Sequence, residues 1–281
     1  MATSATGGVG IPCAFTLLPS KEQIAYDLML KVVKKRVGTN ICLQTIITDY
    51  ESAMFNSLLE YFPDQDHLGC SFHFRKAVWK NMCERGLQSF FYQNADFNEL
   101  LYKLYALAYI PTEHVIRVWE EQIHPFVEQM YANDEDWMEN KPALADFGSY
   151  FTRTWIGVKS GRAGNRRRPM FPLESWNMYE ATLEDGPTTN NTLESWNRTW
   201  NSLNGKHPNL WKVLSNFVKQ EAEARRMLLM EAADYDTHNN TGRKRNSEAY
   251  KARVKSIVSK FGVLPDAGYL QQIAHELSKG D

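Results

Sequence analysis

Residues 41–85 read ICLQTIITDYESAMFNSLLEYFPDQDHLGCSFHFRKAVWKNMCER, and this stretch decides the expected fold class. The run from Ile41 to Ile47 is rich in β-branched side chains, which is typical of a short buried strand. Apolar spacing then predicts a helix from Tyr50 to Tyr61 and another over residues 72–85, and residues 67–70 between them are a candidate strand too short to assign alone. This alternation predicts an α/β layer with at least one parallel strand pair.

The residues before this stretch add one strand and one helix to the expected layer. An apolar run over residues 11–18 ends at Pro19 and predicts a strand. Ser20 then precedes a capped amphipathic helix, whose apolar residues at helical spacing are Ile24, Leu28 and Val32. So few strands do not make a sheet with both faces covered. We therefore expect either a partner that supplies further strands or a chain that begins in the middle of the domain.

Beyond Asp96 the pattern is helical. Apolar residues recur at helical spacing around residues 100–107, 111–130, 144–155, 191–204 and 208–232. Residues 157–172 are rich in Gly, Arg and Pro, which predicts a loop. A polar segment at 233–247 ends in Arg243-Lys244-Arg245 and predicts a mobile linker, and a last pair of helices is expected after it.

The composition is that of a folded protein without a strong overall charge. The chain has 281 residues, of which 43% are hydrophobic and 23% charged, and its net charge is −1. Any binding to nucleic acid must therefore come from local basic patches. No window approaches the roughly 18 apolar residues of a membrane span, the start lacks a signal-peptide pattern, and the four cysteines form no CxxC pair. These features predict a soluble intracellular protein in a reducing compartment.

The first candidate for chemistry is Asp49, which follows the best predicted strand. Catalytic groups gather at the carboxyl ends of strands in open α/β sheets, and a carboxylate there suits Mg²⁺. The alternative is structural, because Thr48-Asp49-Tyr50-Glu51 fits a capping box in which Thr48 caps the next helix and Glu51 bonds back to it. Position alone favours the capping alternative.

The second candidate is a Cys-x-x-His pair, Cys70 and His73, where a predicted helix begins. Residues three positions apart share one face of a helix, so the two side chains are placed to bind one metal ion. A structural zinc site needs four ligands, however, and Cys42 and Cys83 are not spaced as an obvious second pair. The alternative is a buried cysteine next to a hydrogen-bonded histidine.

The third candidate is Glu194, within TTNNTLESWN at residues 188–197. An apolar stripe predicts that a helix starts here and faces a core. The stripe consists of Leu193, Trp196, Trp200 and Leu203. Glu194 lies beside it in the first turn, where it either points into a cleft as a metal ligand or caps a helix that begins at Asn191.

The order of these motifs resembles that of the Mutator-like element (MULE) transposases. An Asp at a strand end is followed by Cys-x-x-His, a long helical stretch and Thr-Asn-Asn-x-x-Glu-x-Trp. The Cys-x-x-His signature is shared with the related hAT group. LLPSK at residues 17–21 and PNLW at 208–211 are also similar to segments of MULE-like proteins. The resemblance covers roughly residues 12–230.

The resemblance implies an α/β, RNase H-like fold with a large all-helical insertion before the last catalytic helix. In such a fold three carboxylates (Asp, Asp, Glu) hold two Mg²⁺ or Mn²⁺ ions for DNA cleavage and strand transfer in cut-and-paste transposition. The chain would then consist of an incomplete core at 11–95, the helical insertion at 96–188, the catalytic-Glu helix and the next core helix at 189–232, and a polar linker with a helical tail at 233–281.

Carried over by motif, Asp49 matches the second Asp and Glu194 the last Glu, so both are expected to be catalytic metal ligands. Cys70 and His73 match the signature that packs near the site. Four arginines of the insertion are expected to contact DNA phosphates, namely Arg162, Arg166, Arg167 and Arg168. The alternative for these arginines is a solvated loop. The implied partner is DNA (transposon ends and target), a homo-oligomer is one option, and the nucleus is the favoured compartment.

One departure from the family pattern changes the expected activity. The family's first Asp lies upstream of the segment matched by residues 11–18, and the residues before that segment contain no acidic side chain. We therefore expect an N-terminally truncated domain that holds its metal ions poorly or not at all. The alternative function is a domesticated, transposase-derived DNA-binding or regulatory protein. A zinc enzyme built on Cys70 and His73 is a third reading.

From this departure we predict that the chain as given does not cleave DNA, because two carboxylates of three do not clamp two metal ions. The measurement is nicking or strand transfer of labelled DNA in Mg²⁺ or Mn²⁺. Robust activity that Asp49→Ala abolishes would contradict the prediction.

Overall fold

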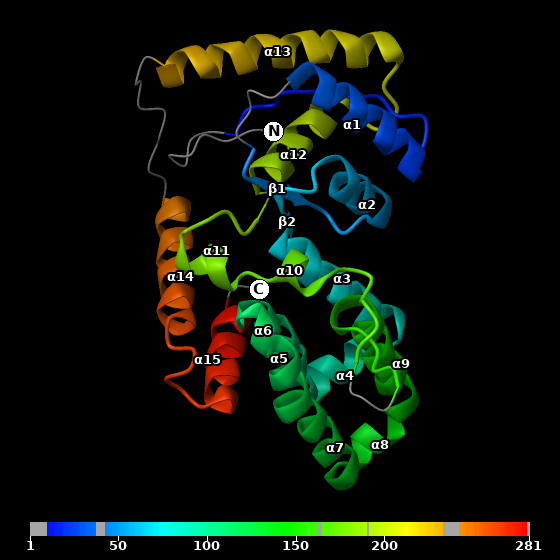
Figure 1. Cartoon of the computed structure of the whole chain (residues 1–281), viewed down its shortest axis with the longest axis vertical. Coiled ribbons are helices and arrows are strands. Elements are labelled where there is room, and N and C mark those ends of the chain that lie inside the picture. Colours follow the sequence, from blue (N-terminus) through cyan, green and yellow to red (C-terminus); the bar gives the residue numbers. More distant parts are fainter. Residues whose placement is uncertain (1–9, 38–42, 162–164, 190, 233–241, 280–281) are drawn as a thin grey trace.

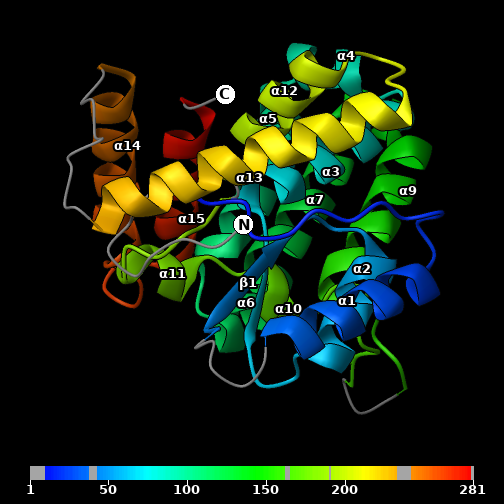
Figure 2. The ribbon, with the colours of Figure 1, turned by 90° about the horizontal axis from the view of Figure 1, so that it is seen from above.

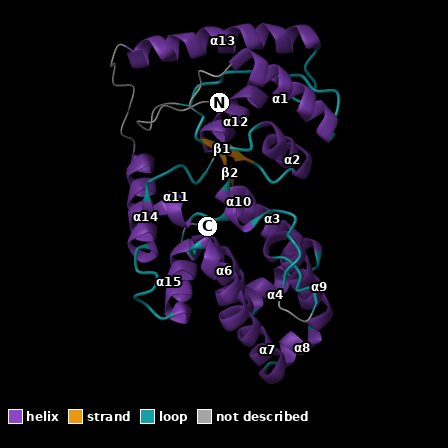
Figure 3. Ribbon diagram, in the orientation of Figure 1, coloured by secondary structure: helices purple, strands orange, loops and turns teal. Residues whose placement is uncertain are grey.

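The computed structural model describes residues 10–37, 43–161, 165–189, 191–232 and 242–279. In these ranges the chain is mostly helical, with one two-stranded parallel sheet. Figures 1 and 3 show the small sheet between a group of helices at one end and a larger helical body at the other. The first group, the sheet-side helices, comprises α1 (Gln23–Val37), α2 (Ser52–Tyr61), α12 (Asn191–Asn204) and α13 (Leu210–Ala232).

The sheet confirms the strand–helix–strand–helix order predicted from residues 41–85. Its strands are β1 (Thr45–Thr48) and β2 (Asp66–Gly69), paired from Thr45 opposite Asp66 to Thr48 opposite Gly69. Helix α2 connects the two strands, and α3 (Ser71–Glu84) begins directly after β2. The start of the strand predicted at 41–47, residues 41 and 42, lies outside the described residues.

The strand predicted over residues 11–18 is wrong. Only Ile11 takes part in a bridge, and the rest of the segment has no regular secondary structure. Its Phe15 instead packs on Trp196, Trp200 and Phe217, with ring centroids 4.8–6.1 Å apart. Within this run Phe15 thus packs against α12 and α13, whereas Leu17 is exposed.

The helical body confirms the helices predicted around 100–107, 111–130 and 144–155. Its α-helices are α4 (Gln88–Gln93), α5 (Ala95–Ala106), α6 (Thr112–Val118), α7 (His124–Asn133), α8 (Glu135–Glu139), α9 (Lys141–Phe151), α10 (Leu173–Trp176) and α11 (Tyr179–Leu183). A 3-10 turn, η2 (Leu107–Tyr109), and two π-helical turns, η3 (Trp119–Ile123) and η4 (Thr152–Ile156), interrupt them. Fully buried Trp137, Trp155 and Trp176 lie in its core.

The expected last helix pair is present and belongs to the helical body. It consists of α14 (Gly242–Val258) and α15 (Asp266–Ser278). Tyr269 and Ile273 of α15 are buried in the core that contains α5, and the Tyr269 hydroxyl donates to the carbonyl of Tyr109. The linker predicted at 233–247 is partly wrong, because α14 already begins at Gly242; residues 233–241 lie outside the described part.

Two of the sheet-side helices carry exposed apolar stripes. Ile24, Leu28 and Val32 of α1 are exposed, whereas Ala25, Tyr26 and Leu30 are buried. Figure 2 shows α13 lying across the end of the molecule. The apolar residues that its sequence pattern placed on one side are exposed except for Phe217, which is partly buried; the exposed ones are Leu210, Leu214, Val218 and Leu228. No helix in the described ranges combines the length and the apolar character needed to cross a membrane.

Tyr50, directly after Asp49, joins the sheet to the helical body. Its ring meets those of Trp155 and Phe171 edge-on, with centroids 4.9 and 5.0 Å apart. Burial raises the pKa of Tyr50 well above its usual value. On its other side the ring lies against Gly69, where an added Cβ would come within 2.1 Å of it. The end of β2 can therefore approach this ring only because residue 69 has no side chain.

We expect Gly69→Ala to lower the free energy of unfolding by about 1–3 kcal/mol, the usual cost of overpacking. The new methyl group would overlap the Tyr50 ring, which the aromatic rings around it hold in place. The measurement is urea unfolding followed by circular dichroism.

The matched control is Gly268→Ala, in helix α15, where an added Cβ meets nothing within 4 Å. Helix propensity predicts that this change raises the free energy of unfolding by about 0.5–1 kcal/mol. If both variants changed stability in the same direction, the proposed packing of Tyr50 on Gly69 would be wrong.

Candidate functional site

Asp49 lies at the carboxyl end of β1, one residue after Thr48. One of its carboxylate oxygens, Oδ1, is 3.0 Å from Nδ1 of His73 in the first turn of α3. The side chain of Asp49 is 53% exposed, and that of His73 is 22% exposed. The carboxylate is thus accessible to ions and substrates from solvent, while the histidine restrains its orientation.

The structure excludes the capping-box alternative for Asp49. Helix α2 begins at Ser52, its N-cap residue is Glu51 without a side-chain capping bond, and Thr48 remains in β1. The Glu51 carboxylate instead accepts a hydrogen bond of 2.6 Å from the Tyr26 hydroxyl. Burial, followed by this hydrogen bond, raises the pKa of Tyr26 to about 12. Thr48 and Glu51 therefore do not form the predicted capping box at the start of α2.

The Cys-x-x-His pair brackets the first turn of α3. Cys70 is the N-cap of this helix, is fully buried, and donates its backbone N–H to the carbonyl of Thr48 at 2.8 Å. Its thiol is not in a disulfide. Among the side chains that the structure describes, no three His, Cys, Asp or Glu residues are grouped as a metal site. The arrangement favours a buried cysteine beside a histidine bonded to a carboxylate over a zinc site.

Helix α12 confirms the helix predicted at 191–204, whereas the side chain of Glu194 lies outside the described part of the chain. The segment that leads into this helix is attached to the site. The backbone N–H of Ser71 donates to the carbonyl of Thr188 at 3.0 Å. The segment just before α12 is therefore tied to the turn that contains Cys70 and His73.

An aromatic stack sets the orientation of α12. The rings of Trp196 and Trp200 are stacked with centroids 5.3 Å apart, and Trp200 stacks on Phe217 of α13 at 4.9 Å. The indole N–H of Trp196 also donates to Gln220 at 2.7 Å. Two members of the predicted stripe are thus packed as expected, whereas Leu203 at the end of the stripe is exposed.

The arginines of the loop at 157–172 differ in their surroundings. Arg166 is directed inward, where its guanidinium pairs with Glu120 and donates to the carbonyl of Gly157. Lys159 pairs with the same Glu120. Arg167 and Arg168 are exposed, and Arg162 lies outside the described residues. Contact with DNA phosphates stays a prediction for the exposed pair, and for Arg166 it would require breaking the pair with Glu120.

The sequence patterns did not indicate two residues that support the site, Tyr26 and Tyr50. Both contacts join residues far apart in the chain, Tyr26 to Glu51 and Tyr50 to the helical body. The only sequence signal is that an aromatic residue directly follows Asp49 at a strand end. Periodicity within one element does not reveal such contacts.

Residues 2–77 match the family described as the MULE transposase domain. This segment contains both strands of the sheet together with Asp49, Cys70 and His73. No curated protein and no solved structure matches the chain.

Arg166 is ion-paired and Arg167 is exposed, so replacing them should affect stability differently. We expect Arg166→Ala to lower the free energy of unfolding by about 1–3 kcal/mol, because it leaves the half-buried Glu120 with Lys159 as its cation partner and the Gly157 carbonyl without its guanidinium donor. We expect Arg167→Ala to change it by less than about 0.5 kcal/mol, as for most exposed positions. Thermal and urea unfolding of the two variants measure this difference, and equal stabilities would contradict the structural role of Arg166.

Proposed function

Because residues 2–77 match the MULE transposase domain, we propose that this chain holds part of the catalytic domain of a MULE-type DNA transposase, with Asp49 and Glu194 as two of the family's three carboxylates. The family implies a transposase-related function with DNA as the partner. The finer proposal is an RNase H-like core that acts on DNA phosphodiester bonds with divalent metal ions. The observation that carries it is the exposed Asp49 carboxylate at the end of β1, held by His73 at 3.0 Å.

The chemistry of the donor atoms fits Mg²⁺ or Mn²⁺. Both ions prefer carboxylate oxygens together with phosphate oxygens of a substrate. Asp49 presents a half-exposed carboxylate, and we assign a second of the family's three carboxylates to Glu194 on α12, as the resemblance implies. The metal would supply activation of the attacking oxygen and neutralisation of the leaving oxygen at the phosphodiester.

The other residues of the site act on this carboxylate and on the backbone around it. His73 holds one oxygen of Asp49, which leaves the orientation of the carboxylate less free than in an exposed loop. Cys70 ties the start of α3 to Thr48, and Ser71 ties the same turn to Thr188 before α12. In the proposed site these two backbone bonds keep the supports of Asp49 and Glu194 at a fixed separation.

DNA would run past the sheet toward the exposed arginines of the loop at 157–172. We assign backbone contacts to Arg167 and Arg168, since each neutralised phosphate releases counterions and strengthens binding. The family resemblance also implies a nuclear location, with a homo-oligomer as one option, and we include both in the proposal.

Manganese binding tests the metal assignment on the chain itself. We expect Asp49→Asn and Glu194→Gln each to weaken Mn²⁺ binding by about tenfold or more, as loss of a metal ligand or its support does. The matched control is Asp66→Asn, an exposed carboxylate at the opposite, amino end of β2, which should leave the affinity unchanged. Electron paramagnetic resonance of free Mn²⁺ in a titration gives the affinity of each variant.

Equal Mn²⁺ affinity of the wild-type chain, Asp49→Asn and Glu194→Gln would contradict the proposed metal site. If the same protein still bound duplex DNA in a fluorescence anisotropy assay, the domesticated DNA-binding alternative would account for that result.

A further inference from the structure

Helix α3 carries a row of exposed side chains that begins next to the candidate site. The row recurs every fourth residue, so its members lie one above the other on one face, and the buried residues of the helix lie on the opposite face. Its members are Phe72, Lys76, Lys80 and Glu84. His73, which contacts Asp49, directly follows the first of them. The row therefore starts beside the Asp49 carboxylate.

Phe72 connects the site to the rest of this row. It is 40% exposed, and its ring meets the His73 ring edge-on, with centroids 5.5 Å apart. His73 in turn lies 3.0 Å from the Asp49 carboxylate. On the other side, Nζ of Lys76 lies over the Phe72 ring, 5.8 Å from its centroid. The carboxylate, the two rings and the ammonium group thus form one continuous series of contacts.

The Lys76 side chain extends toward the start of α3. Phe72 lies about one turn before Lys76, and side chains on a helix point back toward its N-terminus. Because the ammonium group lies over the Phe72 ring, it is at the level of the first turn, which also contains His73. The cation–π contact favours this orientation over the others that are open to an exposed lysine.

The charge of Lys76 is not already neutralised by the protein. Among the residues that the structure describes, no carboxylate pairs with its ammonium group. Lys80, one turn further along α3, lies 3.6 Å from Glu84. Lys21, the cation next to Glu51, lies 3.6 Å from that carboxylate. Lys76 is therefore a cation beside the site that is available for a negatively charged ligand.

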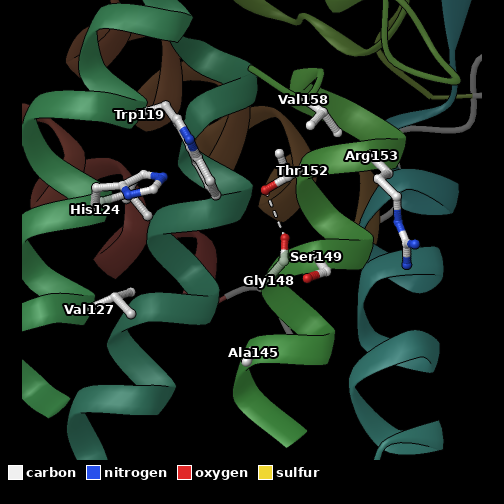
Figure 4. Close-up of a pocket in the computed structure, with 10 residues that line it drawn as sticks. Trp119, His124, Val127, Ala145, Gly148, Ser149, Thr152, Arg153 and Val158 are labelled. Carbon is white, nitrogen blue, oxygen red and sulfur yellow. Dashed lines mark hydrogen bonds between the residues drawn. The ribbon is translucent and has the colours of Figure 1, made fainter. Parts of the chain in front are cut away.

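The helical body also contains a pocket of about 440 Å³, but its lining does not suit a phosphate (Figure 4). The lining is mainly apolar, and the ring of Trp119 already stacks on Phe151 with centroids 5.5 Å apart. In Figure 4 the guanidinium of Arg153 extends away from the interior. The surface of α3 is therefore the better place for an anion.

We propose that Lys76 is a positioning residue that binds a backbone phosphate of DNA next to the phosphodiester at Asp49. This inference rests on the proposed function. A DNA strand carries a regular row of negative charges, so a strand with one phosphodiester at Asp49 places its neighbouring phosphates on the surface around the site. Phosphate contacts set the register and orientation of DNA on a protein without reading its sequence. Lys76 would thus determine which phosphodiester reaches Asp49.

The test measures binding of duplex DNA to Lys76→Met by fluorescence anisotropy, in a KCl series at one constant, low Mn²⁺ concentration. Methionine keeps an unbranched, flexible side chain and removes the charge. We expect about tenfold weaker binding, as loss of a charged contact gives. The slope of log affinity against log salt should fall by about 0.9, the value for one phosphate of duplex DNA. A merely structural role of Lys76 would not change this slope, and Lys76→Arg should restore both values.

The matched control is Lys141→Met. Lys141 is likewise an exposed helical lysine over an aromatic ring, with its Nζ 5.2 Å from the centroid of Tyr131. It begins α9 next to α8, at the end of the helical body away from the sheet (Figure 1). We expect this variant to bind DNA as the wild type does. Equal losses in Lys141→Met and Lys76→Met would indicate a general effect of charge and overturn the proposal.

Unchanged affinity and slope in Lys76→Met overturn the proposal, as does loss of binding in Lys76→Arg or the absence of DNA binding by the wild-type chain. A Mn²⁺ titration of the same samples reports the Asp49 site separately. Lys76→Met should keep the Mn²⁺ affinity of the wild type, since Lys76 is not a metal ligand. A chain that binds Mn²⁺ through Asp49 but binds DNA equally well without the Lys76 charge would keep the proposed function and contradict this inference alone.

Discussion

The contact between the Tyr50 ring and Gly69 is the constraint on which the rest of the arrangement depends. Tyr50 leaves the end of β1 and enters the aromatic core of the helical body, and Gly69 ends β2 against the same ring. Because these residues directly follow or precede the residues of the site, the position of the sheet relative to the helical body also sets where Asp49 and Cys70 lie. A tightly packed core tolerates few alternative positions for such a ring. The site is thus located by packing rather than by its own polar contacts.

The order of elements between residues 41 and 85 could be predicted because each element there has a complete local pattern. β-branched residues, helical spacing and strand-end polar residues agree over this segment, so tertiary contacts did not override them. The segment at 11–18 shows the opposite case. Its apolar residues are as suitable for a strand as those of β1, but Phe15 packs with the rings of α12 and α13. An apolar run indicates burial and not the kind of neighbour that covers it.

The exposed apolar stripes of α1 and α13 show that helical spacing predicts a helix but does not decide which of its faces is buried. Helical spacing correctly predicted both helices, but Ile24 and Val218 are exposed while Tyr26 and Ala224 are buried. At the candidate site, the family resemblance placed Cys70 and His73 near Asp49, but no sequence pattern predicted the 3.0 Å contact between Asp49 and His73. The role of Arg166 could not be read from its neighbours, since its ion-pair partner Glu120 belongs to a distant turn.

The position of α14 and α15 shows that the chain enters the helical body twice. The chain forms the sheet, builds most of the helical body, returns past Thr188 to form α12 and α13, and then enters the helical body again. Each half of the molecule is therefore assembled from two separate parts of the sequence, and neither half corresponds to a continuous piece. Contacts such as Tyr269 with Tyr109 join residues 160 positions apart in the chain. Such a topology slows folding, since distant segments must meet before they stabilise one another. It also makes the two halves a single cooperative unit, in which unfolding of α14 and α15 would lower the stability of the sheet.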